Sequence, residues 1–318
     1  MRIRLARAET VRSISMKQVT VTIPATSANL GPGFDCLGLA LGLYNQVTFT
    51  RQGGGLRITV EGEGAATIPR DERNLVYRAA ARLFSEADVP VPGLHIHQVN
   101  RIPVSSGLGS SAAAVLGGIM AAGAFLPAPP NQPEILRLAT RIEGHPDNIT
   151  PAMLGGLTLI VQEAGELYVE RIDIPAFLVI VVLPEFDFPT STARSVLPAH
   201  ISRQDAIFNA SRLALLIRAL QSGDIAALRL AMQDRLHQPY RLPMIPGMAE
   251  AFAAVQGAGA AVALSGAGPS LLAIAPDNYV EIAHLAADAF AAAGLKARTW
   301  VLPVDARGSV VQTQGGGR

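Results

Sequence analysis

The sequence predicts an α+β protein of two domains. The chain has 318 residues, which is enough for two domains of ordinary size that share a cleft, or for one large domain. Segments with apolar residues at every second position, typical of strands, occur together with segments whose apolar residues recur every three or four positions, typical of helices. Residues 177–183 read FLVIVVL, and this continuous apolar run predicts a strand that is buried on both faces and opens the second domain.

The two ends of the chain are expected to lie outside these domains. Residues 1–17 hold five basic side chains against one acidic side chain and lack the apolar segment of a secretory signal, so we expect a loose extension. We expect the same of the last residues. The predicted division is a disordered extension at residues 1–16, an N-terminal domain at 17–170, a C-terminal domain at 171–305 and a disordered tail at 306–318.

The composition indicates a well-filled core and excludes several partners. Apolar residues make up 49% of the chain and charged residues 16%, which is not the balance of a disordered protein. With a net charge of +1 and 5% aromatic residues, we expect neither nucleic acid nor a membrane as a partner. The single cysteine, Cys36, excludes an internal disulfide framework, so we expect a cytoplasmic protein.

The first half of the chain predicts strands, a shaped loop and a helix. Residues 18–23 read QVTVTI and alternate apolar with polar side chains, as a half-buried strand does, and Pro24 ends this strand. Residues 25–38 contain three glycines and a proline, which predicts a loop whose Asn29 and Asp35 either bond to their own backbone or bind a ligand. The other elements predicted here are strands at 44–50 and 56–61 and a helix from the N-cap Asn74 to about residue 86.

Residues 103–114 read PVSSGLGSSAAA and predict a flexible loop that opens a helix. The first turn of a helix leaves backbone N–H groups without partners and carries a partial positive charge, so such a loop suits a phosphate group. Ser110 and Ser111 can cap this helix, or offer hydroxyl groups to a phosphate oxygen or to Mg²⁺. The alternative is a tight turn that caps a buried, alanine-rich helix. The loop matches neither the Walker nor the dinucleotide-binding fingerprint.

The rest of the chain adds a second glycine turn and two arginines that lack an ion-pair partner nearby in the sequence. Pro133 begins a helix that ends at Gly144. Arg194 and Arg241 lie outside acidic runs, and the arginine fork matches a carboxylate bidentately. The other elements predicted here are strands at 157–162, 261–264, 270–274 and 296–301, a hairpin at 163–170, and helices at 202–223, 224–236 and 280–293.

Several of these motifs resemble those of the GHMP kinases, the superfamily of galactokinase, homoserine kinase, mevalonate kinase and phosphomevalonate kinase. Residues 103–114 resemble the phosphate loop of the superfamily, and SGAGPS at 265–270 is similar to its third motif. The segments that resemble homoserine kinases in particular are ATSANLGPGFD at 25–35, EGHPDN at 143–148, TSTARSVLP at 190–198 and PYR at 239–241. The resemblance implies a two-domain GHMP kinase fold, with an N-terminal domain like domain 2 of ribosomal protein S5 and a ferredoxin-like C-terminal domain.

The resemblance also implies a set of site residues. The implied ligands of the ATP phosphates are Pro103, Ser105, Ser106, Gly107, Leu108, Gly109, Ser110, Ser111 and Ala112. Asn74 is implied near the adenine, and Ser111 and Glu143 are implied as ligands of Mg²⁺ and, with Asn148, as the catalytic residues. The implied ligands of the substrate, L-homoserine, are Asn29, Asp35, His145, Asn148, Thr190, Arg194, Arg241 and Gly266.

The implied function is ATP-dependent phosphorylation of the side-chain hydroxyl of L-homoserine in threonine biosynthesis, by a homodimer. Homoserine kinases are described as lacking a catalytic aspartate, so we do not assign Asp147 as a base, and proton removal rests on a phosphate oxygen or on orientation by Asn148. One alternative is a GHMP kinase for another small alcohol, such as a mevalonate-pathway intermediate, which has no ammonium group for Asp35 to bind. The other is a family member that binds a ligand without catalysis.

Overall fold

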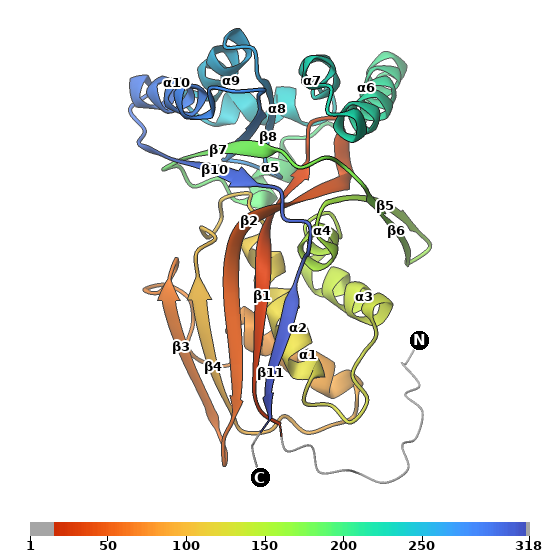
Figure 1. The fold of residues 1–318 in the computed structure, drawn as a ribbon, viewed down its shortest axis with the longest axis vertical. Helices are drawn as coiled ribbons and strands as arrows, with labels where there is room; N and C mark the ends of the chain where they lie inside the picture. The colour runs from red at the N-terminus through yellow and green to blue at the C-terminus, as the bar shows by residue number, and fades with distance from the viewer. Residues whose placement is uncertain (1–15, 316–318) are drawn as a thin grey trace.

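The structure is a computed structural model that describes residues 16–315 of the chain. The expected extension at residues 1–16 therefore lies outside the described residues, apart from Met16, which begins the first strand. Figure 1 shows two layered parts, an N-terminal domain built on a long sheet and a C-terminal domain above it. Within residues 16–315, no helix is long and apolar enough to cross a membrane.

The N-terminal domain contains a seven-stranded sheet with the order β11-β1-β2-β4-β3, to which β5 and β6 are joined through β2. Its strands are β1 (Met16–Asn29), β2 (Gly33–Arg51), β3 (Leu56–Gly62), β4 (Leu94–Asn100), β5 (Leu157–Glu163), β6 (Glu166–Ile172) and β11 (Val310–Gly315). Its helices are α1 (Leu75–Glu86), α2 (Ser110–Gly123), α3 (Gln132–Glu143) and α4 (Ile149–Leu154). Helix α2 packs on β1 and β2, with α1 and α3 beside it (Figure 1).

The C-terminal domain contains a four-stranded antiparallel sheet with the order β10-β7-β9-β8. Its strands are β7 (Leu178–Pro184), β8 (Ala261–Leu264), β9 (Leu271–Ile274) and β10 (Ala297–Pro303). Its helical segments are α5 (Thr190–Ser195), α6 (Arg203–Ser222), α7 (Ile225–Ala231), α8 (Gln238–Arg241), the 3₁₀ turn η1 (Leu242–Met244), α9 (Met248–Gly257) and α10 (Tyr279–Ala292). In chain order, the outer strands are the last and the second, which is the ferredoxin-like arrangement that we predicted.

The predicted N-cap Asn74 and the predicted helix end at Gly144 are confirmed, and the structure adds a capping box that was not predicted. The side chain of Asn74 accepts hydrogen bonds from Val76 N and Tyr77 N at the start of α1. Helix α3 begins with a capping box formed by Asn131 and Glu134, and Gly144 ends it in the left-handed conformation. These local signals were sufficient because capping residues act within one turn of the helix.

The first hairpin is longer than predicted. Strand β1 does not end at Pro24 but continues to Asn29, and β2 begins at Gly33, so most of the expected loop at 25–38 is paired strand. The register shifts between Pro24 and Ala25, and such a bulge lets a proline, which has no N–H to donate, remain within a strand. The tip of this hairpin thus reaches the C-terminal domain (Figure 1).

The expectation of a disordered tail at 306–318 is wrong for the residues of β11. This strand pairs antiparallel with β1, with Val21 opposite Val311 and Val19 opposite Thr313. Without β11, strand β1 would be a free edge of the sheet, with unpaired backbone N–H and C=O groups. The pairing partner is almost the whole chain length away, so no local pattern could reveal it. The predicted domain boundary at 170/171 falls near the end of β6.

A chain that stops at Ser309 tests the contribution of β11. We expect its free energy of unfolding to fall by at least about 1 kcal/mol, the net value of one typical hydrogen bond, because several ladder bonds to β1 are lost. Urea unfolding of the two chains measures this difference. Equal unfolding midpoints would support the disordered tail instead.

Candidate active site

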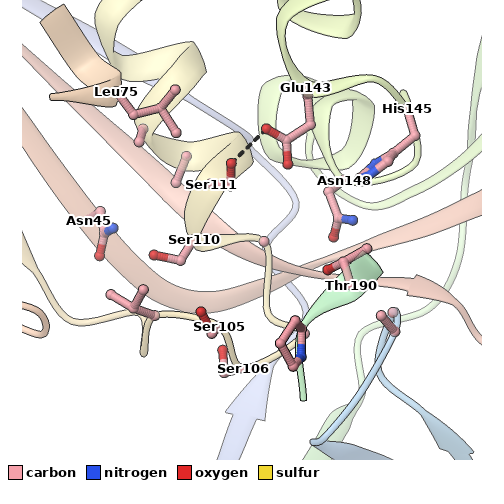
Figure 2. A pocket seen from close by; sticks show the side chains of 18 of the residues that line it. Asn45, Leu75, Ser105, Ser106, Ser110, Ser111, Glu143, His145, Asn148 and Thr190 are labelled. Carbon is pink, nitrogen blue, oxygen red and sulfur yellow. Dashed lines mark hydrogen bonds between the residues drawn. The ribbon is translucent and has the colours of Figure 1, made fainter. Parts of the chain in front are cut away.

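A cavity of about 650 Å³ lies where the two domains meet, and it collects most of the predicted site residues. Its size is that of an ordinary small-molecule site. Figure 2 shows side chains from both domains that line it. The predicted site residues that line the cavity are Asn29, Asp35, Asn74, Ser105, Ser106, Gly107, Gly109, Ser110, Ser111, Glu143, His145, Asn148, Thr190, Arg194, Arg241 and Gly266.

Three predicted phosphate-loop residues do not line this cavity. The side chains of Leu108 and Ala112 are fully buried in the core, on the other side of the loop. Pro103 accepts a hydrogen bond at its carbonyl oxygen from the Ser106 hydroxyl (2.8 Å). These three residues therefore support the conformation of the loop and do not contact the cavity.

The loop opens α2 as predicted, but the serines do not cap the helix. The N-cap is Gly109, which has φ +72° and offers no side chain to the first turn, while Ser110 and Ser111 are the first two helical residues. The N–H groups at the start of α2 therefore donate no hydrogen bond to an N-cap side chain. This end of the helix lines the cavity. A positive helix end with available donors is suited to an anion.

Two neighbouring segments determine the shape of the phosphate loop. The turn between β8 and β9 donates from the Ser265 hydroxyl to the Gly107 carbonyl oxygen (2.8 Å) and from Ser270 N to the Ser106 carbonyl oxygen (3.3 Å). Strand β1 donates from Thr26 N to the Leu108 carbonyl oxygen (3.1 Å). The approach is so close that a β-carbon on Gly107 would collide with the carbonyl oxygens of the β8–β9 turn.

Ser111 and Glu143 form a hydrogen-bonded pair, drawn as the dashed line in Figure 2. The Ser111 hydroxyl donates to Glu143 Oε2 at 2.7 Å. Burial raises the pKa of Glu143, and the hydrogen bond from Ser111 acts in the opposite direction. A carboxylate and a hydroxyl are the hard oxygen ligands that Mg²⁺ prefers, so the pair fits this ion. Within residues 16–315, no group of three or more His, Cys, Asp or Glu side chains is placed to hold a metal ion, so the remaining ligands would be phosphate and water oxygens.

The segment after Glu143 supplies two further polar groups. Asn148 accepts a hydrogen bond at Oδ1 from the Thr26 hydroxyl (2.8 Å), which orients the amide beside the phosphate loop. His145 Nδ1 lies 3.1 Å from Asp147 Oδ1, and this hydrogen bond raises the pKa of His145. Asp147 is almost fully buried, and its carboxylate is hydrogen-bonded to His145.

The end of the cavity next to the C-terminal domain is strongly polar. Arg194 donates two hydrogen bonds to the carboxylate of Asp35, at 2.9 and 3.2 Å, and both side chains are partly exposed. Asn29 accepts from Asp35 N (3.0 Å) and donates to the Gly266 carbonyl oxygen (2.9 Å). The sequence analysis predicted that Asp35 and Arg194 each bind one charge of the same ligand. In the structure the two side chains form an ion pair with each other.

Arg241 is a buried cation beside this pair. Its residue is 1% exposed, and burial lowers the pKa of the guanidinium to about 10, with nearby Arg194 acting in the same direction. It therefore remains charged at neutral pH. A buried charge needs hydrogen-bond acceptors, and Arg241 donates to the carbonyl oxygens of Ala193 and Gly266. Arg241 also lines the cavity.

The opposite end of the cavity has several apolar side chains among its lining residues, and the sequence analysis did not identify them. Its apolar lining residues include Ile68, Pro69, Leu75 and Val104. Asn74 is fully buried, and its amide donates to the Pro69 carbonyl oxygen (2.8 Å) and accepts from Gln98 Nε2 (3.0 Å) as well as from α1. The only signal in the sequence was an Ile-Pro pair within a polar turn that ends at an N-cap.

Comparison with known proteins agrees with this architecture. The family model for the GHMP kinase N-terminal domain matches residues 74–156, and the model for the GHMP kinase C-terminal domain matches residues 216–292. A homoserine kinase of Moorella thermoacetica is 45% identical over 293 residues, covering 92% of this chain and 99% of the relative. A homoserine kinase of a Synechococcus species is 43% identical, with 93% and 99% covered.

Solved structures lead to the same family. The crystal structure of homoserine kinase from Cytophaga hutchinsonii has a TM-score of 0.84 and 28% identity, covering 97% of this chain and all of the other. Mevalonate diphosphate decarboxylase from Enterococcus faecalis, at 15% identity and a TM-score of 0.64, shares only the fold. The chain therefore belongs to the GHMP kinases, and among them to the homoserine kinase family.

The variant Gly107→Ala tests the close packing of the phosphate loop. We expect kcat/KM for ATP to fall about 10- to 100-fold, because a small displacement of a positioning loop is costly in rate. Gly165→Ala is the matched control, since Gly165 also has positive φ but has open space around it. If the two variants lose equal activity, the close packing at Gly107 does not account for the loss in kcat/KM.

Proposed function

We propose that this protein is a homoserine kinase, which transfers the γ-phosphoryl group of ATP to the side-chain hydroxyl of L-homoserine and forms O-phospho-L-homoserine. The observation that carries the proposal is one cavity that holds an anion-binding loop with a Ser111–Glu143 pair at one end and the charged group of Asp35, Arg194 and Arg241 at the other. The names of the relatives support it. We expect a homodimer acting in the cytoplasm, where the reaction supplies threonine biosynthesis.

ATP would occupy the N-terminal part of the cavity. The backbone of residues 105–111 and the start of α2 face the triphosphate, and the apolar wall near Leu75 and Ile68 receives the adenine. The amide of Asn74 is occupied by hydrogen bonds within the protein. Its role is thus to hold the adenine wall at the start of α1 rather than to read the base.

Mg²⁺ would be held by Ser111 and Glu143, whose oxygens are 2.7 Å apart and open to the cavity. The ion, when bound, neutralises phosphate charge and helps to align the transferred group. Glu143 must be ionised for this role; burial raises the pKa of its carboxyl group, and the hydrogen bond from Ser111 lowers it.

Homoserine would occupy the polar end as a zwitterion. Its carboxylate suits the forks of Arg194 and Arg241, and its ammonium group suits the carboxylate of Asp35. The Asp35–Arg194 ion pair keeps these two charges satisfied before the substrate binds. Binding then exchanges one ion pair for pairs with both ends of the zwitterion, so no charge is left unpaired.

The remaining groups orient the acceptor hydroxyl. Asn148, His145 and Thr190 line the same cavity, and in the view of Figure 2 Asn148 lies between His145 and Thr190. We assign no residue as a base, because Asp147 is buried and bonded to His145. The rate would come from alignment and charge stabilisation, and the hydroxyl proton would pass to a phosphate oxygen.

ADP release with homoserine, mevalonate and galactose, measured side by side, tests the proposed function. We expect turnover with homoserine and at most a trace with the other two, because only homoserine offers an ammonium group to Asp35. Absence of homoserine-dependent ADP release at saturating MgATP would overturn the proposal. Turnover with mevalonate alone would favour another GHMP kinase activity.

The variant Glu143→Gln tests the metal role. We expect kcat to fall at least about tenfold, with partial recovery at high Mg²⁺, because the amide keeps the shape but loses the charge that holds the ion. Glu166→Gln is the control, since the Glu166 side chain is exposed and far along the β5–β6 hairpin. Unchanged Mg²⁺ dependence in Glu143→Gln would remove this residue from the metal site.

A further inference from the structure

A buried histidine lies directly behind the polar end of the cavity. His237 is fully buried, precedes α8 and contacts Arg241 without lining the cavity itself. We propose that His237 is a positioning residue, which orients the Arg241 guanidinium for the carboxylate of the substrate and ties it to the β1–β2 hairpin that carries Asp35. This inference rests on the proposed function, and it concerns a residue that no motif in the sequence singled out.

The contacts of Arg241 define what His237 does. The guanidinium donates from Nε to the Ala193 carbonyl oxygen (3.0 Å) and from Nη1 to His237 Nδ1 (3.2 Å) and the Gly266 carbonyl oxygen (3.4 Å). Within residues 16–315, no acceptor forms a hydrogen bond with the third nitrogen, Nη2. Because two of the three nitrogens are held by protein and the residue lines the cavity, Nη2 is the nitrogen available to a carboxylate.

The tautomer of His237 follows from its second contact. Nε2 lies 2.8 Å from the Gly31 carbonyl oxygen, which can only accept, so Nε2 carries the proton. Nδ1 is then a lone pair that accepts from Arg241. Burial, with the charge of Arg241, lowers the pKa of His237, while Asp234 and Asp35 act in the opposite direction. A neutral ring is thus the form that matches both neighbours.

The surroundings fix the ring in this orientation. Asp234 accepts from His237 N (2.9 Å) and Gln238 N (2.7 Å), which holds the backbone at the start of α8. The ring of Phe34 stacks on the imidazole with 5.1 Å between centroids. Phe34 precedes Asp35, and Gly31 lies in the same hairpin turn. The imidazole of His237 therefore contacts both the hairpin that carries Asp35, the proposed ligand of the ammonium group, and Arg241 on α8, the proposed ligand of the carboxylate.

Two variants of His237 separate its two hydrogen bonds. The oxygen of an asparagine side chain can occupy the place of Nδ1, whereas the amide of glutamine reaches the place of Nε2. His237→Asn therefore keeps an acceptor for Arg241 and loses the donor to Gly31, and His237→Gln does the reverse. We expect His237→Gln to raise KM for homoserine at least about tenfold, the scale of one charge-assisted hydrogen bond, with KM for ATP nearly unchanged. His237→Asn should raise KM for homoserine much less.

The outcomes decide between positioning and packing. If His237 only fills the core, both variants lower the melting temperature and neither changes KM for homoserine selectively, which would overturn the inference. Equal increases in KM for homoserine in the two variants, or a parallel increase in KM for ATP, would overturn it too. The unaltered protein serves as reference: if it lacks homoserine-dependent turnover, the proposed function fails, whereas turnover with no difference between the variants refutes only the role of His237.

A measurement on the unaltered chain covers the case in which a variant does not fold. The chain has six histidines, and ¹⁵N spectra of the imidazoles, assigned by replacing the other five one at a time, report the tautomer of His237. We expect the neutral ring with the proton on Nε2 at pH 7 and a shift of the Nδ1 resonance when homoserine is added. A charged ring, or a proton on Nδ1, would overturn the inference.

Discussion

The site depends on the contact among three segments that are distant in the sequence: the phosphate loop, the β1–β2 hairpin and the β8–β9 turn. Two of the bonds between them join backbone groups, from Thr26 N to the Leu108 carbonyl oxygen and from Gly266 N to the Ala28 carbonyl oxygen (3.1 Å). A third is donated by the Ser265 hydroxyl to the Gly107 carbonyl oxygen. The glycines in these segments permit this approach, because side chains would separate the backbones. The phosphate end and the polar end of the cavity are therefore parts of one rigid unit.

Charge balance links this unit to the proposed substrate. The polar end holds two arginines and one aspartate, and the Asp35–Arg194 ion pair leaves Arg241 as a buried cation whose protein contacts are all with neutral acceptors. The carboxylates of Asp35, Asp234 and Asp147 act on Arg241 without a hydrogen bond to it. A ligand that brings a carboxylate into contact with Arg241 would therefore be favoured, and Asp35 could receive the ammonium group of that ligand. At the other end, the carboxylate of the partly exposed Glu143 lines the cavity, where a bound cation would balance its charge. The charges at both ends of the cavity are thus opposite to those of the proposed ligands.

Sequence reasoning predicted the fold where the evidence was local. The N-cap of α1, the end of α3 at Gly144 and the apolar strand β7 were correct, since each depends on neighbours within a few residues. It failed where a distant strand supplied the hydrogen bonds, as in β11 and in the continuation of β1 beyond Pro24. It also expected serine caps on α2, because Ser110 and Ser111 suit an N-cap, whereas a left-handed glycine occupies that position.

The sequence by itself predicted the kind of site. The glycines and serines before a helix predicted a phosphate loop, and the resemblance of the motifs to those of homoserine kinases implied a carboxylate for a metal ion and arginines for a carboxylate. Only the tertiary structure decided which groups contact each other. It placed Arg194 on Asp35, committed the amide of Asn74 to the protein, and put His237 between Gly31 and Arg241. A hydrogen bond needs its two atoms about 3 Å apart, and across such separations in sequence only the folded chain determines that distance.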